Sequence, residues 1–246
     1  MKISVIVPCF NAAAELELCL AALRRQSHKA HEIIVVDDAS TDNSVRVAKE
    51  FEVTLLCRAK NAGAATARAE GAAQAAGEVL AFIDADCIAP ENWIEKIATA
   101  FRDSPELGGL GGPYTHESGT TWLGTLCALE ESYVHHVFSS HPDEAIPPGG
   151  NCAFLKRVWD SGRSGRELSF FGGMGSGEDS LVGHELRQIA KIQFNPDLAV
   201  QHHVREGRGY FRRHFNRGIS RSTIWFNQLS DVSESNLTLE AFGGWS

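Results

Sequence analysis

The sequence predicts an α/β fold built on a mostly parallel central sheet with helices on its faces. Short apolar segments that suit buried strands alternate with segments whose apolar residues recur at helical spacing. The expected strands of the N-terminal part lie at residues 3–8, 32–36, 53–56 and 79–83. Strands joined by helices in this way form parallel, right-handed, doubly wound sheets. The fourth strand also ends abruptly in Asp84 and Asp86, at the sheet edge where such folds bind ligands.

The first elements are predicted from apolar spacing and from their boundary residues. Pro8 is expected to stop the first strand, because proline has no N–H for a ladder hydrogen bond. The helix at 14–25 has an acidic start and a basic end, which suit the helix dipole. The second strand ends in Asp37 and Asp38, and the next helix is expected to begin around Ser40.

The elements around the fourth strand are equally regular. An alanine-rich helix is expected at 66–76, and Gly77 is expected to close it as the glycine that follows a helix end. A further helix at 90–101 places its large apolar residues on one face, and a short strand falls within 108–113.

The regular alternation weakens past residue 105, so the second half is expected to be a more irregular lobe on the same sheet. The elements expected there are a mixed helical stretch at 120–138, a strand after the turn at 147–150, a glycine-rich loop at 170–177, a helix at 178–189 and a strand within 192–200. We therefore divide the chain into two halves of one domain, 1–105 and 106–246.

Composition restricts the classes of function. The net charge of −8 and the pI near 5.7 argue against a nucleic-acid binder, whose surface would be basic. The six cysteines form no Cys-x-x-Cys pair, which is typical of a reduced cytosolic protein. We expect no signal peptide, because the N-terminus runs directly into a strand, and no apolar run approaches the length of a membrane span.

The Asp84-Ala85-Asp86 segment is open to two interpretations. Taken alone, it is more often an acidic turn after a strand, since aspartate favours turns. Alternatively, a divalent cation with a phosphorylated ligand would relieve the repulsion between the two carboxylates. The sequence has neither the glycine-rich dinucleotide motif nor a P-loop, so a metal at Asp86 would have to hold the phosphates.

Six short motifs stand in order along residues 3–205. They are Val5-Ile6-Val7-Pro8-Cys9-Phe10-Asn11, Ile34-Val35-Val36-Asp37-Asp38-Ala39-Ser40-Thr41-Asp42, Asn61-Ala62-Gly63 with Ala67-Arg68, Ala81-Phe82-Ile83-Asp84-Ala85-Asp86, Gly150-Asn151 and Gly177-Glu178-Asp179. In this order they resemble the motifs of family 2 glycosyltransferases with the GT-A fold. Two departures are Cys9, where the family commonly has Thr or Ser, and Ala69, where it often has Asn. The resemblance implies a GT-A fold, with residues 1–105 as the nucleotide-sugar-binding half and 106–246 as the acceptor-side half that carries the catalytic base.

The resemblance implies a nucleotide-binding set, which comprises Pro8, Asn11, Asp38, Asn61, Arg68, Asp84 and Ala85. Asp38 would accept a hydrogen bond from a ring N–H of the base, which suits uracil; its alternative is an N-cap for the following helix. Arg68 would reach the base or the phosphates; its alternative is an arginine on the helix surface. Asp84 would hold the ribose.

The resemblance also implies the metal ligands and the reacting groups. Asp86 would coordinate Mn²⁺ or Mg²⁺ on the diphosphate. His202 or His203 would be a further metal ligand or a donor to the diphosphate, and His202 is preferred because it shares a strand face with Val200; the alternative is a surface histidine pair. Asp179 would be the general base, with Glu178 beside it in the catalytic set; the alternative is an ordinary acidic helix start.

Three further residues are assigned to the diphosphate or the donor sugar, namely Asn151, Arg205 and Arg208. The basic segment 205–221 has a compatible second interpretation as a patch for anionic lipid headgroups. Peripheral membrane contact is therefore a further prediction.

The implied function is metal-dependent, inverting transfer of a sugar from a nucleotide-diphosphate donor, expected to be a UDP-sugar, to an acceptor hydroxyl. The acceptor is expected to belong to polysaccharide, lipid-linked or cell-surface glycan synthesis, with the protein in the cytoplasm, including the inner face of the membrane. One alternative is a catalytically silent sugar-nucleotide-binding protein on the same fold. Another is a nucleotidyltransferase, which would want a basic, glycine-rich loop after the first strand that residues 9–12 do not offer.

Overall fold

A computed structural model describes residues 1–115, 125, 129, 140, 148–162 and 185–203. The main sheet has the strand order β3-β2-β1-β4-β8-β6-β9. Its strands are β1 (Ile3–Cys9), β2 (Glu32–Asp37), β3 (Thr54–Cys57), β4 (Val79–Ile83), β6 (Leu107–Gly111), β8 (Asn151–Leu155) and β9 (Lys191–Phe194). All are parallel to their neighbours except β8, which runs antiparallel to both β4 and β6. The predicted α/β class with a mostly parallel sheet is confirmed.

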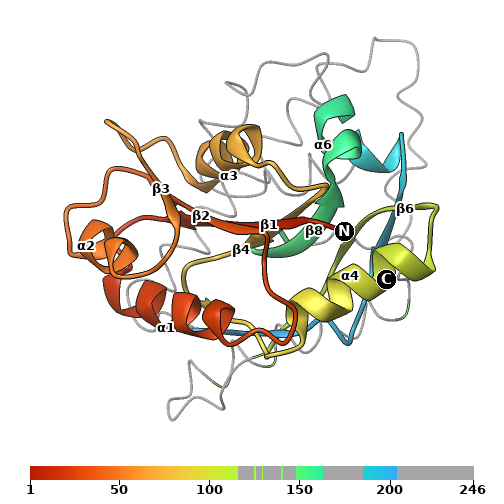
Figure 1. Cartoon of the computed structure of the whole chain (residues 1–246), viewed down its shortest axis with the longest axis horizontal. Helices are drawn as coiled ribbons and strands as arrows, with labels where there is room; N and C mark the ends of the chain where they lie inside the picture. Colours follow the sequence, from red (N-terminus) through yellow and green to blue (C-terminus); the bar gives the residue numbers. More distant parts are fainter. Residues whose placement is uncertain (116–124, 126–128, 130–139, 141–147, 163–184, 204–246) are drawn as a thin grey trace, which may run out of the picture.

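Helices cover both faces of this sheet (Figure 1). They are α1 (Ala13–Arg24), α2 (Ser44–Lys49), α3 (Ala64–Gln74), α4 (Trp93–Asp103) and α6 (Lys156–Gly162). One apolar cluster packs α1, α2 and α4 on Val5 and Val7, and the other packs α3 and α6 on Ile6. Because successive residues of a strand point to opposite faces, one uninterrupted apolar strand supplies both cores.

Two boundary predictions were wrong. β1 continues through Pro8 to Cys9. Its pairing with β4 ends at Ile6, so at Pro8 the strand has only β2 beside it, and proline is tolerated at such an edge. Gly77 does not close α3, whose cap is Ala75. It is glycine because a Cβ there would collide with Ser4 and with the backbone of β1.

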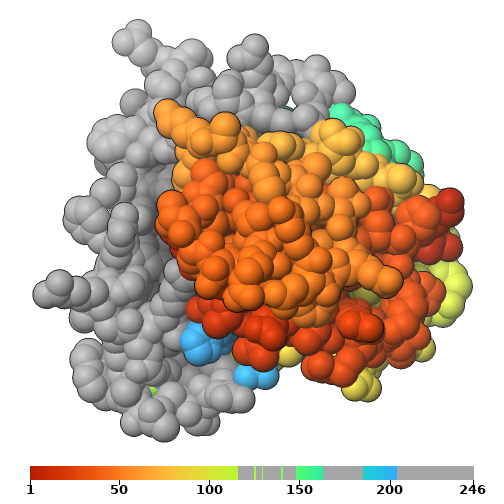
Figure 2. All heavy atoms as spheres, turned by 60° about the vertical axis from the view of Figure 1, so that its left-hand side comes forward, coloured from red at the N-terminus to blue at the C-terminus, as the bar shows by residue number. Residues whose placement is uncertain are grey.

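A small second sheet joins three distant segments in the order β5-β10-β7. They are β5 (Cys87–Ile88), β7 (Tyr114–Thr115) and β10 (Val200–His202). β10 runs antiparallel to β5 and parallel to β7, which brings residues near 200 to the carboxyl end of β4. In Figure 2 the blue segment near residue 200 reaches the surface beside the red N-terminal residues. Within the described residues, no helix is long and apolar enough to cross a bilayer.

Candidate active site

The predicted site residues of the N-terminal half gather at one edge of the main sheet. β1, β2 and β4 are parallel, so the segments that follow them leave the sheet on the same side. These segments carry Asn11, Asp38 and the pair Asp84 and Asp86. This is the edge where open α/β sheets bind their ligands.

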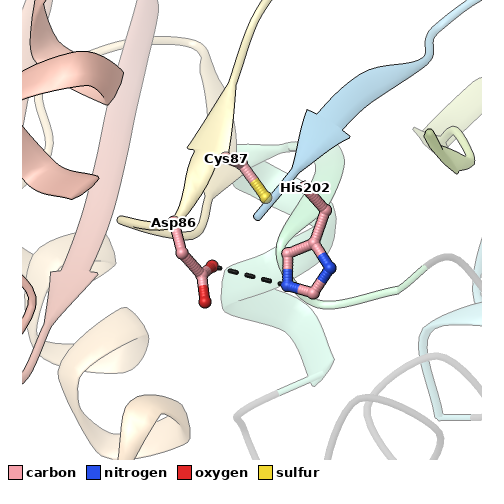
Figure 3. Close-up of side chains that lie close together, drawn as sticks. All are labelled: Asp86, Cys87 and His202. Atoms are coloured by element: carbon pink, nitrogen blue, oxygen red, sulfur yellow. Dashed lines mark ion pairs between the residues drawn. The ribbon is translucent and has the colours of Figure 1, made fainter. Parts of the chain in front are cut away.

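Asp86 and His202 face each other across the small sheet, and their carboxylate Oδ1 and imidazole Nε2 are 3.6 Å apart (Figure 3). The backbone fixes this arrangement, because His203 N–H donates to the Asp86 carbonyl (2.9 Å) and His202 pairs with Cys87. The His202 side chain is 9% exposed, and its ring lies against Tyr114 with centroids 4.8 Å apart. As predicted, His202 is buried on the same face as Val200, whereas His203 is exposed.

The donor set at this point fits a divalent cation. Asp86, Cys87 and His202 each offer one ligand atom, and these atoms lie within 4.8 Å of one another. Carboxylate oxygen and imidazole nitrogen together suit Mn²⁺, and the carboxylate alone suits Mg²⁺. Metal binding by Asp86 and His202 stays a prediction, and the sequence did not indicate that the Cys87 thiol lies beside these two side chains.

Cys9 at the end of β1 and Cys87 at the start of β5 are buried thiols. Burial, with help from the charges of Asp84 and Asp86, raises the pKa of Cys87 well above its ordinary value. Burial likewise raises the pKa of Cys9 to about 11, so this departure from the family pattern adds a neutral thiol and not a nucleophile. In the described part of the chain Cys9, Cys19, Cys57, Cys87 and Cys152 form no disulfide.

Asp84 is held by a salt bridge from Arg68, with Nη2 2.6 Å from Oδ1. Arg68 comes from α3 and is 9% exposed, so its alternative interpretation as a surface arginine is wrong. Asp84 N–H donates to the Gly150 carbonyl at 3.2 Å. A Cβ on Gly150 would collide with the Asp84 carboxylate and lie 2.6 Å from the Tyr114 hydroxyl. Asp84, Arg68 and Gly150 therefore form one closely packed unit next to the metal candidate.

Asp38 is buried and its carboxylate already has several partners. It accepts from Arg58 (2.5 Å), from Ala62 N–H (3.1 and 3.2 Å) and from Gly63 N–H (2.8 Å). It thus anchors the chain before α3 and does not cap α2, where Asp42 accepts from Ser44 N–H instead. A hydrogen bond donated by a base N–H to Asp38 stays a prediction, and in this structure the Asp38 carboxylate already accepts from Arg58 and from two backbone N–H groups.

Asn11 and Asn61 organise the loops beside Asp38. Asn11 adopts a positive φ of 49°, and its Oδ1 accepts from the N–H groups of Thr41 (2.8 Å) and Asp42 (3.3 Å). Asn61 Nδ2 donates to the Asp38 carbonyl at 3.2 Å. Pro8 and Ala85 are both buried, so a role for either would be to shape the wall of a pocket.

The Asn151 side chain is engaged within the protein, and its contact with the donor stays a prediction. The side chain is fully buried, its Oδ1 accepts from Trp93 Nε1 (3.0 Å), and its Nδ2 donates to the carbonyls of Pro113 (3.0 Å) and Leu198 (2.7 Å). All its polar atoms therefore tie α4 to the chain before β7 and β10. The sequence could not reveal this task, because the partners lie far from Asn151 along the chain.

Four predicted residues lie outside the described residues: Glu178, Asp179, Arg205 and Arg208. Their roles stay predictions.

Comparison with known proteins establishes the class. Residues 4–161 match the model of Glycosyl transferase family 2, so the chain belongs to this family. A sequence relative, the uncharacterized glycosyltransferase YibD of Escherichia coli, is 38% identical over 128 residues, which are 49% of this chain and 37% of YibD. The chain thus matches less than half the length of this relative.

Solved glycosyltransferase structures share the fold. The mannosyltransferase PcManGT of Pyrobaculum calidifontis, in complex with GDP-Man and Mn²⁺, aligns with a TM-score of 0.71 at 20% identity over 94% of this chain and 65% of its own. Residues 1–349 of S. aureus TarS, in complex with UDP-GlcNAc, align with a TM-score of 0.64 at 22% identity over 85% and 60% of the two chains. The predicted GT-A fold is confirmed.

Proposed function

We propose that this protein is a metal-dependent, inverting glycosyltransferase that moves a sugar from a nucleotide-diphosphate donor, a UDP-sugar, to an acceptor hydroxyl. The observation that carries the proposal is the placement of Asp86 against His202 at the carboxyl end of β4, beside the salt bridge of Asp84 with Arg68. Membership of Glycosyl transferase family 2 supports the reaction class.

In this proposal each of these residues has a role in donor binding. Asp86 and His202 would hold Mn²⁺ or Mg²⁺, which would act as a Lewis acid and neutralise charge on the departing diphosphate. Arg68 orients the Asp84 carboxylate through their salt bridge, and Asp84 accepts from a ribose hydroxyl. Asp38, Asn11 and Asn61 order the loops that would enclose the base.

The chemical step needs a base on the face of the sugar opposite to the diphosphate. We assign this role to Asp179, which takes the proton of the acceptor hydroxyl while that oxygen attacks the anomeric carbon. The bond to the diphosphate oxygen breaks as the new bond forms, so the anomeric configuration inverts. Glu178 lies next to Asp179, and Arg205 and Arg208 would close on the diphosphate as charged donors.

The choice of UDP and of a glycan or lipid-linked acceptor is part of the proposal. TarS has been crystallised with UDP-GlcNAc and PcManGT with GDP-Man, so donors of this kind occur on this fold. An acceptor at a lipid surface would place the protein in the cytoplasm, at the inner face of the membrane.

The test is a screen of common sugar nucleotides with Mn²⁺ that follows release of the nucleoside diphosphate. We expect the native protein to release nucleoside diphosphate from at least one UDP-sugar. Asp86→Ala should lose both this release and metal-dependent nucleotide binding. Asp179→Asn should keep its nucleotide affinity but transfer sugar about 10²–10⁴-fold more slowly. Nucleotide binding without transfer or hydrolysis would favour the alternative, a catalytically silent sugar-nucleotide-binding protein. Transfer by Asp179→Asn at the native rate would show that the base is another residue.

A further inference from the structure

The group at the carboxyl end of β4 contains a sulfur atom as well as a carboxylate oxygen and an imidazole nitrogen. The Cys87 thiol, the Asp86 carboxylate and the His202 imidazole present atoms within 4.8 Å of one another, and the last two are 3.6 Å apart. Figure 3 shows the Cys87 sulfur beside the facing carboxylate and imidazole. These three side chains represent three different ligand chemistries at one point.

Local backbone geometry explains how the side chains of the adjacent residues Asp86 and Cys87 can face the same site. In an extended strand the side chains of Asp86 and Cys87 would point to opposite faces. Here Asp86 lies in a turn, since Cys87 N–H donates to the Asp84 carbonyl at 3.0 Å and β5 starts only at Cys87. The rule that successive side chains of a strand point to opposite faces therefore does not apply to Asp86 and Cys87, and both can face His202.

The position of the sulfur relative to the imidazole is fixed by strand pairing. Cys87 is the direct cross-strand partner of His202 in the antiparallel pair of β5 and β10. Cross-strand partners have Cβ atoms about 4.5–5.5 Å apart, so their side chains meet on one face of the sheet. A ligand held by His202 is thus next to the Cys87 sulfur.

We propose that Cys87 is a third metal ligand, which makes this site bind Zn²⁺ and Co²⁺ in preference to Mg²⁺. The inference rests on the metal site of the proposed function, but not on sugar transfer. Metal–ligand bonds of about 2.0–2.3 Å in a tetrahedral site place the ligand atoms roughly 3.3–3.8 Å apart. The observed spacing of 3.6 Å between Asp86 and His202 meets this requirement, and the Cys87 sulfur lies within 4.8 Å of both ligand atoms.

The chemistry of the ligands explains why Zn²⁺ and Co²⁺ should bind more tightly than Mg²⁺. A thiolate is a soft ligand that suits Zn²⁺ and Co²⁺, whereas Mg²⁺ takes oxygen ligands. When a thiophilic metal binds, the metal–sulfur bond forms and the thiol proton is released to solvent, so no oxidant or reductant is needed. Three protein ligands leave a fourth position open, as in catalytic zinc sites.

The test is a titration of the metal-free protein with one equivalent of Co²⁺, followed by absorption in the near ultraviolet. We expect a thiolate-to-cobalt charge-transfer band in the native protein, its loss in Cys87→Ser and in Cys87→Ala, and its retention in Cys57→Ser. Cys57 is exposed at the end of β3 and is the matched control for a thiol outside the group.

A competition experiment measures the selectivity. We expect Cys87→Ser to weaken Zn²⁺ binding at least about 10-fold while leaving Mg²⁺ affinity within about twofold of native. If the native protein binds Co²⁺ without a thiolate band, binds none, or keeps the band in both Cys87 variants, Cys87 is not a ligand. These readouts need no sugar nucleotide, so a protein that shows the band but transfers no sugar keeps this inference and loses the proposed function.

Discussion

Asp38 and Asp86 occupy similar places in the fold but have different surroundings. Each follows a parallel strand of the main sheet, β2 or β4, at the same edge. The Asp38 side chain is 3% exposed and bound by Arg58 and two backbone N–H groups. The Asp86 side chain is 20% exposed and faces His202. At equivalent strand ends, the Asp38 carboxylate is therefore buried and bound within the protein, whereas the Asp86 carboxylate is partly exposed at the sheet edge.

The difference follows from what the chain does after each strand. After β2, the loop before α3 returns over Asp38 and donates Ala62 and Gly63 N–H groups to it. After β4, the chain turns and forms β5, which uses backbone groups to bind β10 and leaves the Asp86 carboxylate at the edge. Burial and hydrogen bonding, and not residue type, therefore decide which carboxylate can meet a ligand.

Loss of the Arg58 charge should have the largest effect on stability. Arg58→Met would leave the Asp38 carboxylate buried with only its backbone donors, which should lower the free energy of unfolding by about 3 kcal/mol. Urea denaturation measures this change. Arg46→Met is the matched control, because the Arg46–Glu50 pair is exposed and should change stability by less than about 0.5 kcal/mol. Equal effects of the two substitutions would mean that Asp38 does not depend on Arg58.

A larger side chain at Gly150 should have an intermediate effect on stability and should also weaken nucleotide binding. In Gly150→Ala the new methyl group collides with the Asp84 carboxylate, so overpacking should cost about 1–3 kcal/mol and move Asp84 away from Arg68. We expect weaker nucleotide binding, measured by calorimetry. Gly108→Ala collides with Ala190 away from Asp84 and should lose stability but keep nucleotide affinity. If both variants bound nucleotide like the native protein, Asp84 would not contact the donor.

The sequence predicted the sheet and much of its edge because these depend on local pattern. The apolar runs identified β1, β2 and β4, and Val200 placed His202 on the buried face by strand alternation. The facing pair of Asp86 and His202 was therefore within reach of a sequence argument supported by a family resemblance.

The contacts that the sequence missed are long-range. Arg58 meets Asp38 only because β3 lies beside β2, and Cys87 meets His202 only because β10 pairs with β5. Asn151 is buried by partners from α4 and from the chain before β7 and β10. The spacing of residues along the chain contains no information on such pairings. The ligand contact predicted for Asn151 therefore rested only on the resemblance of Gly150-Asn151 to a family motif.

Removal of the Asp86 charge should have the smallest effect on stability. In Asp86→Asn the backbone bond from His203 remains, and an amide of nearly the same size stays beside His202, so the substitution should cost only about 1 kcal/mol. We therefore expect urea denaturation close to native, together with loss of Mn²⁺-dependent nucleotide binding, because a neutral amide is a poor ligand for a hard cation. A loss of stability as large as that of Arg58→Met would instead make Asp86 a second scaffold carboxylate, and the contrast between the two strand ends would disappear.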